Sequence, residues 1–225
     1  MAKNFALAAL AVAAFAAHAE KMPLFNGNDL SGWTAVVDYD LTGGYTACEP
    51  VWSVVDGAIR TPGTPFGYLR TKRADFGDFK LHVEYRWWRK TENPNSGLFV
   101  RVGGEPVSFV PVCLENQLGA GSAGMLIGCG GLSYKAVRDG AEVSPNEVAP
   151  GVLIVDRAAE SSEKPFGEWN EIEVVVEGNT LVNRVNGVEQ NRAVAISVVK
   201  GAIALQSEGG AIEFRNIWIE EKQHE

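Results

Sequence analysis

Residues 171–187 read EIEVVVEGNTLVNRVNG, and this stretch decides the class of fold. Between Ile172 and Val176 every second side chain is apolar, and most of the side chains between and beside them are charged, which is the period of a half-buried β-strand. Gly178 turns the chain into a second run over 180–185. The Asn186-Gly187 pair that follows is a strong hairpin signal, because both positions tolerate a positive φ. The stretch therefore predicts antiparallel strands joined by tight turns.

Most of the remaining chain has the same character, with short alternating runs separated by Gly, Asn, Asp and Pro, and few helix signals. The clearest further runs are 79–88, 96–102, 110–118 and a final hairpin of 201–208 with 211–220. Segment 119–168 is instead rich in Gly, Ser, Ala and Pro, and connections of this length are often functional loops. Because each strand has one apolar face to bury, we expect an all-β fold of two packed antiparallel sheets.

The first nineteen residues have the composition of a secretory signal. Lys3 provides a positive start, 5–17 is an apolar run, and Ala17-His18-Ala19 has the small-x-small pattern of a signal-peptidase site. The run is shorter than the roughly 20 apolar residues that span a bilayer. We expect cleavage after Ala19, one domain over 20–225, no integral membrane segment in the mature chain, and a periplasmic or secreted location. A buried core helix is the alternative interpretation.

Charge and cysteine content limit the partners and the chemistry. The formal net charge is −8 at pH 7, and an acidic surface repels phosphate backbones, which argues against nucleic acid as a partner. Of the three cysteines, Cys48, Cys113 and Cys129, the last two are nearest in sequence. In an oxidising compartment they could close a disulfide, but the spacing leaves this question open.

Nucleophile and metal-site motifs are absent, so candidate functional residues come from the alternation itself. If the runs 79–88, 96–102 and 110–118 are neighbours, one face collects His82, Glu84, Arg86, Arg101, Glu115 and Gln117. Gln206 and Glu208 alternate with small alanines, which would leave room above the sheet. Carboxylates, guanidinium groups and amides suit hydroxyl-rich ligands, and Trp169 could stack on a sugar ring. The alternative is a solvated face with ordinary cross-strand ion pairs.

Several blocks of the sequence resemble the 3-keto-disaccharide hydrolase family. LFNGNDLSGW at 24–33 is similar to its opening motif, NSGLFVR at 95–101 to a middle block, and LQSEGGAIEFRNI at 205–217 to its closing signature. The resemblance implies a concanavalin A-like lectin/glucanase jelly roll with its site on the concave face. The family's Glu-x-Gln pattern is kept at Glu115-Asn116-Gln117, but the acidic residue that should follow is missing.

The resemblance also implies cleavage of the glycosidic bond of 3-keto-glycosides or 3-keto-disaccharides. A ketone at C3 acidifies the hydrogen on C2, so a base can remove it, the C1 aglycone leaves by elimination, and water adds to the enone. We assign Glu115 as base or metal ligand, Glu84 as its partner, and Arg101 as the group that stabilises the oxyanion. The expected substrate-binding residues are Gln117, His82, Gln206, Glu208 and Trp169.

The sequence establishes no cofactor, although a divalent metal could bind among Glu84, Glu115, Glu208 and His82, because carboxylate and imidazole suit several metals. Two other functions remain open. A conventional glycoside hydrolase needs two carboxylates at a defined separation, and the three glutamates could supply them. A non-catalytic carbohydrate-binding module is the other alternative, because a fold alone does not fix a function.

Overall fold

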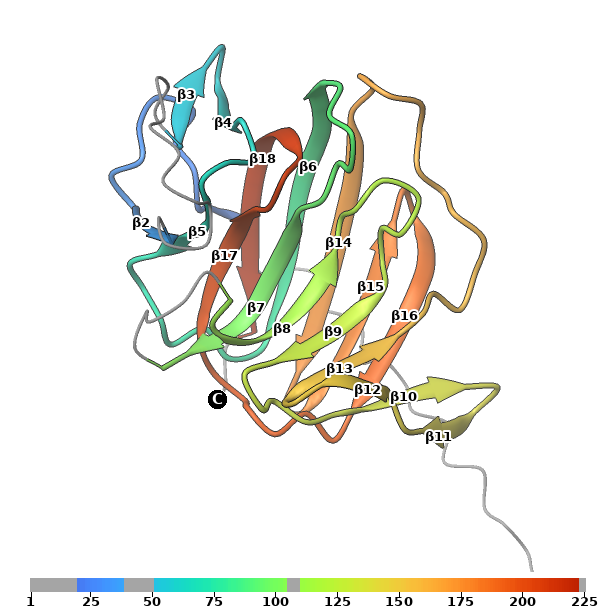
Figure 1. Cartoon of the computed structure of the whole chain (residues 1–225). Coiled ribbons are helices and arrows are strands. Elements are labelled where there is room, and N and C mark those ends of the chain that lie inside the picture. The colour runs from blue at the N-terminus through green and yellow to red at the C-terminus, as the bar shows by residue number, and fades with distance from the viewer. Residues whose placement is uncertain (1–19, 39–50, 105–109, 223–225) are drawn as a thin grey trace, which may run out of the picture.

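The computed structural model describes residues 20–38, 51–104 and 110–222, and they form two antiparallel β-sheets (Figure 1). The ten-stranded sheet contains, in spatial order, β11 (Ala141–Val143), β10 (Lys135–Arg138), β16 (Val188–Val194), β15 (Thr180–Val185), β14 (Asn170–Glu177), β6 (Phe79–Arg89), β18 (Ala211–Glu221), β4 (Ala58–Thr61) and β3 (Ser53–Val55), with β1 (Met22–Pro23) paired to β18. The eight-stranded sheet contains β12 (Asn146–Ala149), β13 (Val152–Val155), β9 (Leu126–Cys129), β8 (Val112–Gln117), β7 (Gly97–Gly103), β17 (Ala202–Ser207), β5 (Phe66–Thr71) and β2 (Trp33–Asp38).

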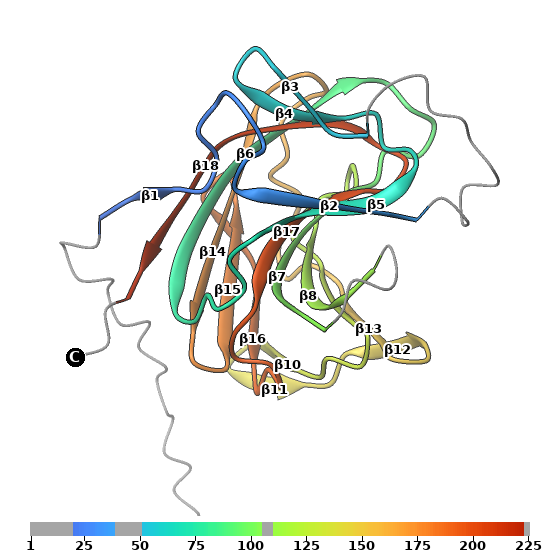
Figure 2. The ribbon, with the colours of Figure 1, turned by 90° about the vertical axis from the view of Figure 1, so that its left-hand side faces the viewer.

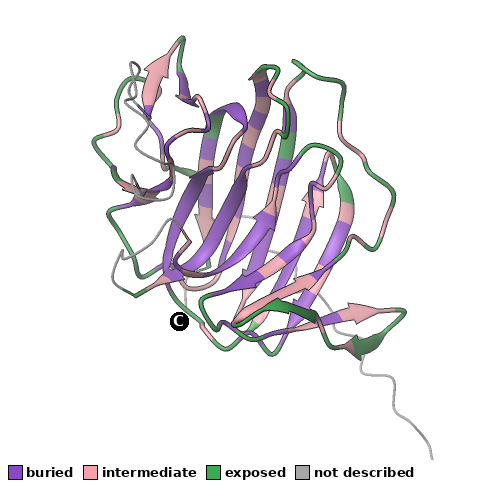
Figure 3. Ribbon diagram, in the orientation of Figure 1, coloured by how far each residue is buried: buried purple, intermediate pink, exposed green. Residues whose placement is uncertain are grey.

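The two sheets pack face to face, which confirms the predicted all-β sandwich (Figure 2). The core between them is made by one side of each strand, for example Leu81 and Val83 of β6 against Leu98 and Val100 of β7. Figure 3 shows β7 and β17 buried along nearly their whole length. No helix within the described ranges is long and apolar enough to cross a membrane.

The stretch that predicted the fold forms the hairpin β14–β15. Ile172 pairs with Val185 and Val176 with Leu181, so the alternate apolar side chains of the two strands lie on the same face. Ile172, Val174 and Val176 are fully buried in the core. The turn that follows β15 has the predicted positive φ values, 48° at Asn186 and 79° at Gly187.

Two strand pairings predicted from the sequence are wrong. β6 lies between β14 and β18 in the ten-stranded sheet, whereas β7 and β8 pair in the eight-stranded sheet. The expected hairpin at Gly209-Gly210 is likewise a link from β17 in one sheet to β18 in the other. At this crossing a side chain on Gly210 would overlap the ring of Trp87. Alternation in a strand indicates that one face is buried, but it does not specify the partner strand. The β6–β7 and β17–β18 links each lead from one sheet to the other, instead of forming a hairpin within one sheet.

Segment 119–168 differs from the long loop that its composition suggested. It contains five short strands, of which β9, β12 and β13 extend the eight-stranded sheet and β10 and β11 extend the ten-stranded one. The turn before β9 is tied to the opposite sheet, because Asn183 and Asn191 both donate hydrogen bonds from their side-chain amides to the carbonyl of Gly124, at 3.1 and 2.7 Å. Asn183 also donates to Asn116 Oδ1 at 3.0 Å, so a buried polar network joins the two sheets.

Arg101 does not face a ligand site, which corrects its expected role as the oxyanion-stabilising group. It sits at a bulge in β7 with a φ of 58°, and this irregular backbone redirects its side chain. The guanidinium group is 1% exposed and donates to the carbonyls of Phe76, Gly77 and Gly178, and also to that of Val199. Arg101 therefore holds three connecting segments at one end of the sandwich.

We expect Arg101→Met to lower the free energy of unfolding by about 3 kcal/mol or more, because several buried carbonyls would lose their donor. Urea denaturation followed by tryptophan fluorescence measures the change. Arg192→Gln is the matched control, since Arg192 forms a partly exposed ion pair with Glu189, and such pairs contribute about 1 kcal/mol or less. A decrease in the free energy of unfolding of Arg101→Met as small as that of Arg192→Gln would contradict the structural role of Arg101.

Candidate active site

The outer face of the eight-stranded sheet, which points away from the ten-stranded sheet, carries half of the predicted site residues. Leu205 pairs with Leu98, which sets Gln206 beside Gly97, and Gly97 in turn pairs with Gln117. In the next row Phe99 lies opposite Glu115. Because side chains alternate along each strand, Gln206, Gln117 and Glu115 share this face.

Gly97 makes room for the carboxyl group of Glu115. A side chain at position 97 would overlap Glu115 Oε1 and would lie 3.0 Å from Gln206 Oε1. Glu115 is only 4% exposed and Gln206 1%, and neither of these two oxygens has a hydrogen-bond partner in the described part of the chain. Two buried acceptors without donors are costly, so the site is completed by a proton on Glu115 or by donors from a ligand.

Burial raises the pKa of Glu115 well above its ordinary value, and the neighbouring Cys129 and Glu208 raise it further. The desolvation of the charged form is the main cause. A protonated Glu115 has an O–H that can donate toward Gln206 Oε1, which removes the conflict between the two acceptors.

Glu208 is the second carboxyl group of this face. Asn95 Nδ2 donates to Glu208 Oε2 at 2.6 Å, and the side chain of Gln206 forms another hydrogen bond with Glu208. Burial raises the pKa of Glu208 as well, although the bond with Gln206 opposes that shift. Asn95, Glu208, Gln206 and Glu115 thus lie close together at this site.

Gln117 has a fixed orientation that presents its amide nitrogen. Gln117 Oε1 accepts hydrogen bonds from the backbone N–H groups of Leu118 and Gly119, both at 2.8 Å. The Nε2 group at the other end of the same amide is therefore the end that can donate to a ligand.

Two residues of this site were not predicted from the sequence. Asn95 was noted only as the first residue of the NSGLFVR block, and no pattern indicated that it would contact Glu208. Tyr68 of β5 is fully buried beside Phe99, with ring centroids 6.1 Å apart, and its hydroxyl has no partner among the described residues. The alternation of β5 could have placed Tyr68 on this face, had the pairing of β5 with β17 been known.

The cysteine pair borders the same carboxyl group. Cys113 and Cys129 lie directly opposite each other in β8 and β9, and both are buried free thiols in the structure. Cys129 Sγ lies 4.0 Å from Glu115 Oε2. The third cysteine, Cys48, falls outside the described residues.

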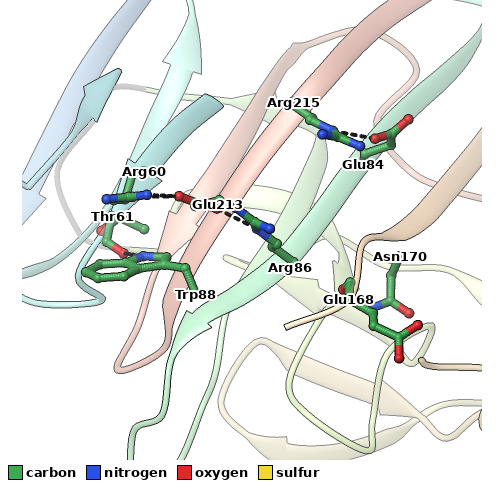
Figure 4. A network of polar contacts seen from close by, with 9 residues as sticks. All are labelled: Arg60, Thr61, Glu84, Arg86, Trp88, Glu168, Asn170, Glu213 and Arg215. Atoms are coloured by element: carbon green, nitrogen blue, oxygen red, sulfur yellow. Dashed lines mark hydrogen bonds and ion pairs between the residues drawn. The ribbon is translucent and has the colours of Figure 1, made fainter. Parts of the chain in front are cut away.

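Glu84, His82 and Trp169 lie on the opposite side of the molecule, which corrects their expected place beside Glu115. Figure 4 shows Glu84 paired with Arg215 on the outer face of the ten-stranded sheet, at 2.6 Å, and Asn216 donates to Glu84 at 2.9 Å. The guanidinium groups of Arg86 and Arg215 both lie over the Trp169 ring, at 4.5 and 3.9 Å from its centroid. His82 stacks on Trp218 with centroids 4.8 Å apart.

The core therefore separates these side chains from Glu115, since packed sheets lie about 10 Å apart. The metal set of Glu84, Glu115, Glu208 and His82 cannot form, because its members are on two outer faces. Within residues 20–38, 51–104 and 110–222 there is no group of three or more His, Cys, Asp or Glu side chains placed to hold a metal ion.

Residues 20–220 match the family described as the 3-keto-alpha-glucoside-1,2-lyase-like domain. The chain belongs to this family. The match covers most of the sequence and confirms the resemblance found in its motifs, and it supports a carbohydrate-acting function for this lyase-like domain. None of the curated proteins matches the chain.

Solved structures agree with the fold of the lyase-like domain. A protein provisionally assigned as a glycosyl hydrolase, from Parabacteroides distasonis, is 17% identical with a TM-score of 0.60, over 90% of this chain and 94% of that one. A carbohydrate-binding module from Bacillus subtilis is 10% identical with a TM-score of 0.57, over 86% and 98%. A β-1,3-1,4-glucanase from a mouse hindgut metagenome is 16% identical with a TM-score of 0.51, over 91% and 99%. At these identities the likeness confirms the lectin/glucanase sandwich and nothing beyond the fold.

The two glutamates on opposite faces predict opposite pH dependences of stability. The pKa of Glu115 is raised in the folded state, so its favourable contribution is complete below its ordinary value of 4.5 and is lost as the pH rises through the folded pKa. For Glu84, burial raises the pKa, but the hydrogen bonds from Arg215 and Asn216 outweigh burial and leave it below 4.5. Its contribution is therefore present above 4.5 and is lost in acid.

We therefore expect the stability of Glu115→Gln relative to the wild type to increase as the pH rises from 4.5 to 8. Glu84→Gln should be less stable than the wild type at pH 7, and the difference should shrink in acid. Urea denaturation at a series of pH values measures both effects. If the free energies of unfolding of Glu115→Gln and the wild type changed in parallel with pH, folding would not raise the pKa of Glu115.

Proposed function

We propose that this protein cleaves the glycosidic bond of 3-keto-glycosides on the outer face of the eight-stranded sheet, through Glu115 and Glu208. The observation that carries the proposal is the buried carboxyl group of Glu115 close to the partly buried carboxyl group of Glu208, in a member of the 3-keto-alpha-glucoside-1,2-lyase-like family. Pairs of carboxyl groups whose environments differ are the usual means of providing an acid and a base in one site.

In this proposal Glu208 is the base and Glu115 the acid. Glu208 accepts hydrogen bonds from Asn95 and Gln206, which favour its ionised form, whereas Glu115 has an unpartnered buried oxygen, which favours its protonated form. This reverses the role that the sequence suggested for Glu115. Gln117 Nε2 is a donor for the C3 oxygen or a neighbouring hydroxyl, in place of the buried Arg101.

The reaction balances with these groups alone. Glu208 removes the proton on C2, and the electron pair of that C–H bond enters the C2–C3 enolate. The enolate then expels the C1 substituent, the C1–O bond breaks with its electrons on oxygen, and Glu115 delivers its proton to that oxygen. Water then adds to the enone: Glu115 takes a proton from the water as its oxygen bonds to C1, and Glu208 returns its proton to C2. Both groups are thereby restored, and the net reaction is hydrolysis. The low-dielectric surroundings of Glu115 strengthen the hydrogen bond to the leaving oxygen.

Glutamine variants of the two carboxylates test the assignment. With the 3-keto form of an aryl glucoside as substrate, Glu115→Gln and Glu208→Gln should each lower kcat by about 10²- to 10⁴-fold, because each removes a proton-transfer group. Glu84→Gln is the matched control on the opposite sheet and should remain within about twofold of the wild type, since it contacts no reacting atom. In the wild type, kcat/KM should rise as Glu208 ionises and fall as Glu115 ionises.

The unoxidised aryl glucoside, assayed in parallel, distinguishes the alternatives. Cleavage of the keto compound alone supports elimination assisted by the ketone. Equal cleavage of both compounds would indicate a conventional glycosidase, and cleavage of neither would overturn the proposed enzyme. Loss of activity in Glu84→Gln equal to that in Glu115→Gln would place the chemistry on the other sheet.

We also propose that the protein is exported, on the basis of the apolar run and the Ala17-His18-Ala19 pattern in residues 1–19, which lie outside the described residues. Expression of the full chain should yield a mature periplasmic or secreted protein that begins at Glu20. Intact mass and N-terminal sequencing of the recovered protein measure this. An intact N-terminus on protein retained in the cytoplasm would contradict it.

A further inference from the structure

A pocket of about 450 Å³ opens beside the proposed active site. One wall is the turn between β8 and β9, and the other is the segment that follows β13. The lining residues are Gly121, Ser122, Met125, Asp156, Arg157, Ala158, Ala159 and Glu160. Its volume is within the range of small-molecule sites, and no step of the proposed reaction uses it.

The pocket adjoins Gln117 of the proposed active site through Met125. The backbone N–H of Gln117 donates to the carbonyl of Met125 at 3.0 Å, so these residues lie side by side. Residues two apart on one face of a strand are separated by about 6.8 Å and neighbouring strands by about 4.8 Å, which puts Met125 about 8 Å diagonally from Glu115. A group attached to the leaving oxygen at Glu115 can therefore reach the pocket by extending over Gln117.

The wall formed by the turn is held in place by both neighbouring segments. Arg157 donates to the carbonyl of Gly121 at 2.6 Å, and Glu163 accepts from the N–H of Gly121 at 2.8 Å. Ser122 donates to the carbonyl of Gly119 at 2.9 Å. These bonds hold the rim in one conformation before a ligand arrives, which lowers the entropy lost on binding.

The lining has the chemistry of a sugar site. The carboxylates of Asp156 and Glu160 are on exposed residues and can accept from hydroxyl groups. The guanidinium group of Arg157 can donate to hydroxyl oxygens, and Met125 offers an apolar contact for the C–H face of a ring. Such a lining does not favour a flat aryl group, since the pocket wall contains no aromatic side chain.

We propose that this pocket is a second sugar subsite, which binds the sugar unit linked through oxygen to C1 of the oxidised ring and so sets a preference for sugar over small or aryl aglycones. This inference rests on the proposed function, because it takes Glu115 as the group beside the leaving oxygen. It assigns substrate selection to the turn 119–125 and the segment 156–160.

The test uses the wild type, Asp156→Trp and Arg192→Trp on the full mature chain. Asp156→Trp fills the pocket with a bulky side chain at an exposed position. Arg192→Trp adds the same bulk to a neighbouring pocket, formed by residues within 137–140 and 189–192 and sharing only Ala158 and Ala159 with the first, and is the matched control. The substrates are a 3-keto-disaccharide and the 3-keto methyl glycoside of the same ring and anomer. Thermal unfolding confirms that both variants are folded.

Asp156→Trp should lower kcat/KM for the disaccharide about tenfold or more, equivalent to about 1.4 kcal/mol. Its kcat/KM for the methyl glycoside should stay within about twofold of the wild-type value. Arg192→Trp should change neither. An equal effect of Asp156→Trp on both substrates, or none on either, would overturn the subsite.

Failure of the proposed cleavage reaction can be distinguished from failure of the subsite. If the wild type cleaves neither keto compound, the proposed function is overturned, and calorimetric titration with the unoxidised disaccharide and methyl glycoside then decides the subsite. Weaker disaccharide binding in Asp156→Trp alone would preserve the subsite without the chemistry. Equal affinities in all three proteins would reject both.

Discussion

The burial of one face of each sheet in a shared core is the constraint on which the other features depend. Because side chains alternate, a strand that places Leu98 or Leu114 in the core must direct its other side chains to the outer face. Glu115 and Gln117 are fixed on that face by the same register that buries Leu114. A shift of one residue would exchange the polar site and the core, so the stability of the sandwich and the placement of the site have a common origin.

The outer faces of the two sheets differ in the groups that surround their carboxylates. On the ten-stranded sheet, Glu213 is buried between Arg60 and Arg86, and Glu84 is paired with Arg215, so the carboxylates there are matched by cations (Figure 4). On the eight-stranded sheet, amides and thiols surround Glu115 and Glu208, and a carboxylate among neutral groups keeps its proton more readily. The second environment is suited to proton transfer and the first to a stable surface.

The sequence predicted the positions of the strands more reliably than which strands pair with each other. Alternation identified the runs that became β6, β7, β8 and β14, and the Asn186-Gly187 turn was correct in position and in backbone conformation. Periodicity could not show that the links after β6 and β17 cross the core, because partner choice depends on the whole set of strands. Glu84 was therefore placed beside Glu115, and Arg101 was treated as a surface cation although a bulge turns it inward. Glu115, Gln117, Gln206 and Glu208 do share one face, and their predicted participation in the site stays a prediction.

The amide ties from Asn183 and Asn191 to the carbonyl of Gly124 have a consequence for how this fold can diversify. They fix the base of the turn before β9 to the opposite sheet, while positions 120–122 nearer its tip are not held by that network. Side-chain changes at the tip can therefore accumulate without loosening the sandwich, because Arg157 and Glu163 hold Gly121 by its backbone. The surface of this tip can thus change by single substitutions while Glu115 and Glu208 remain where they are.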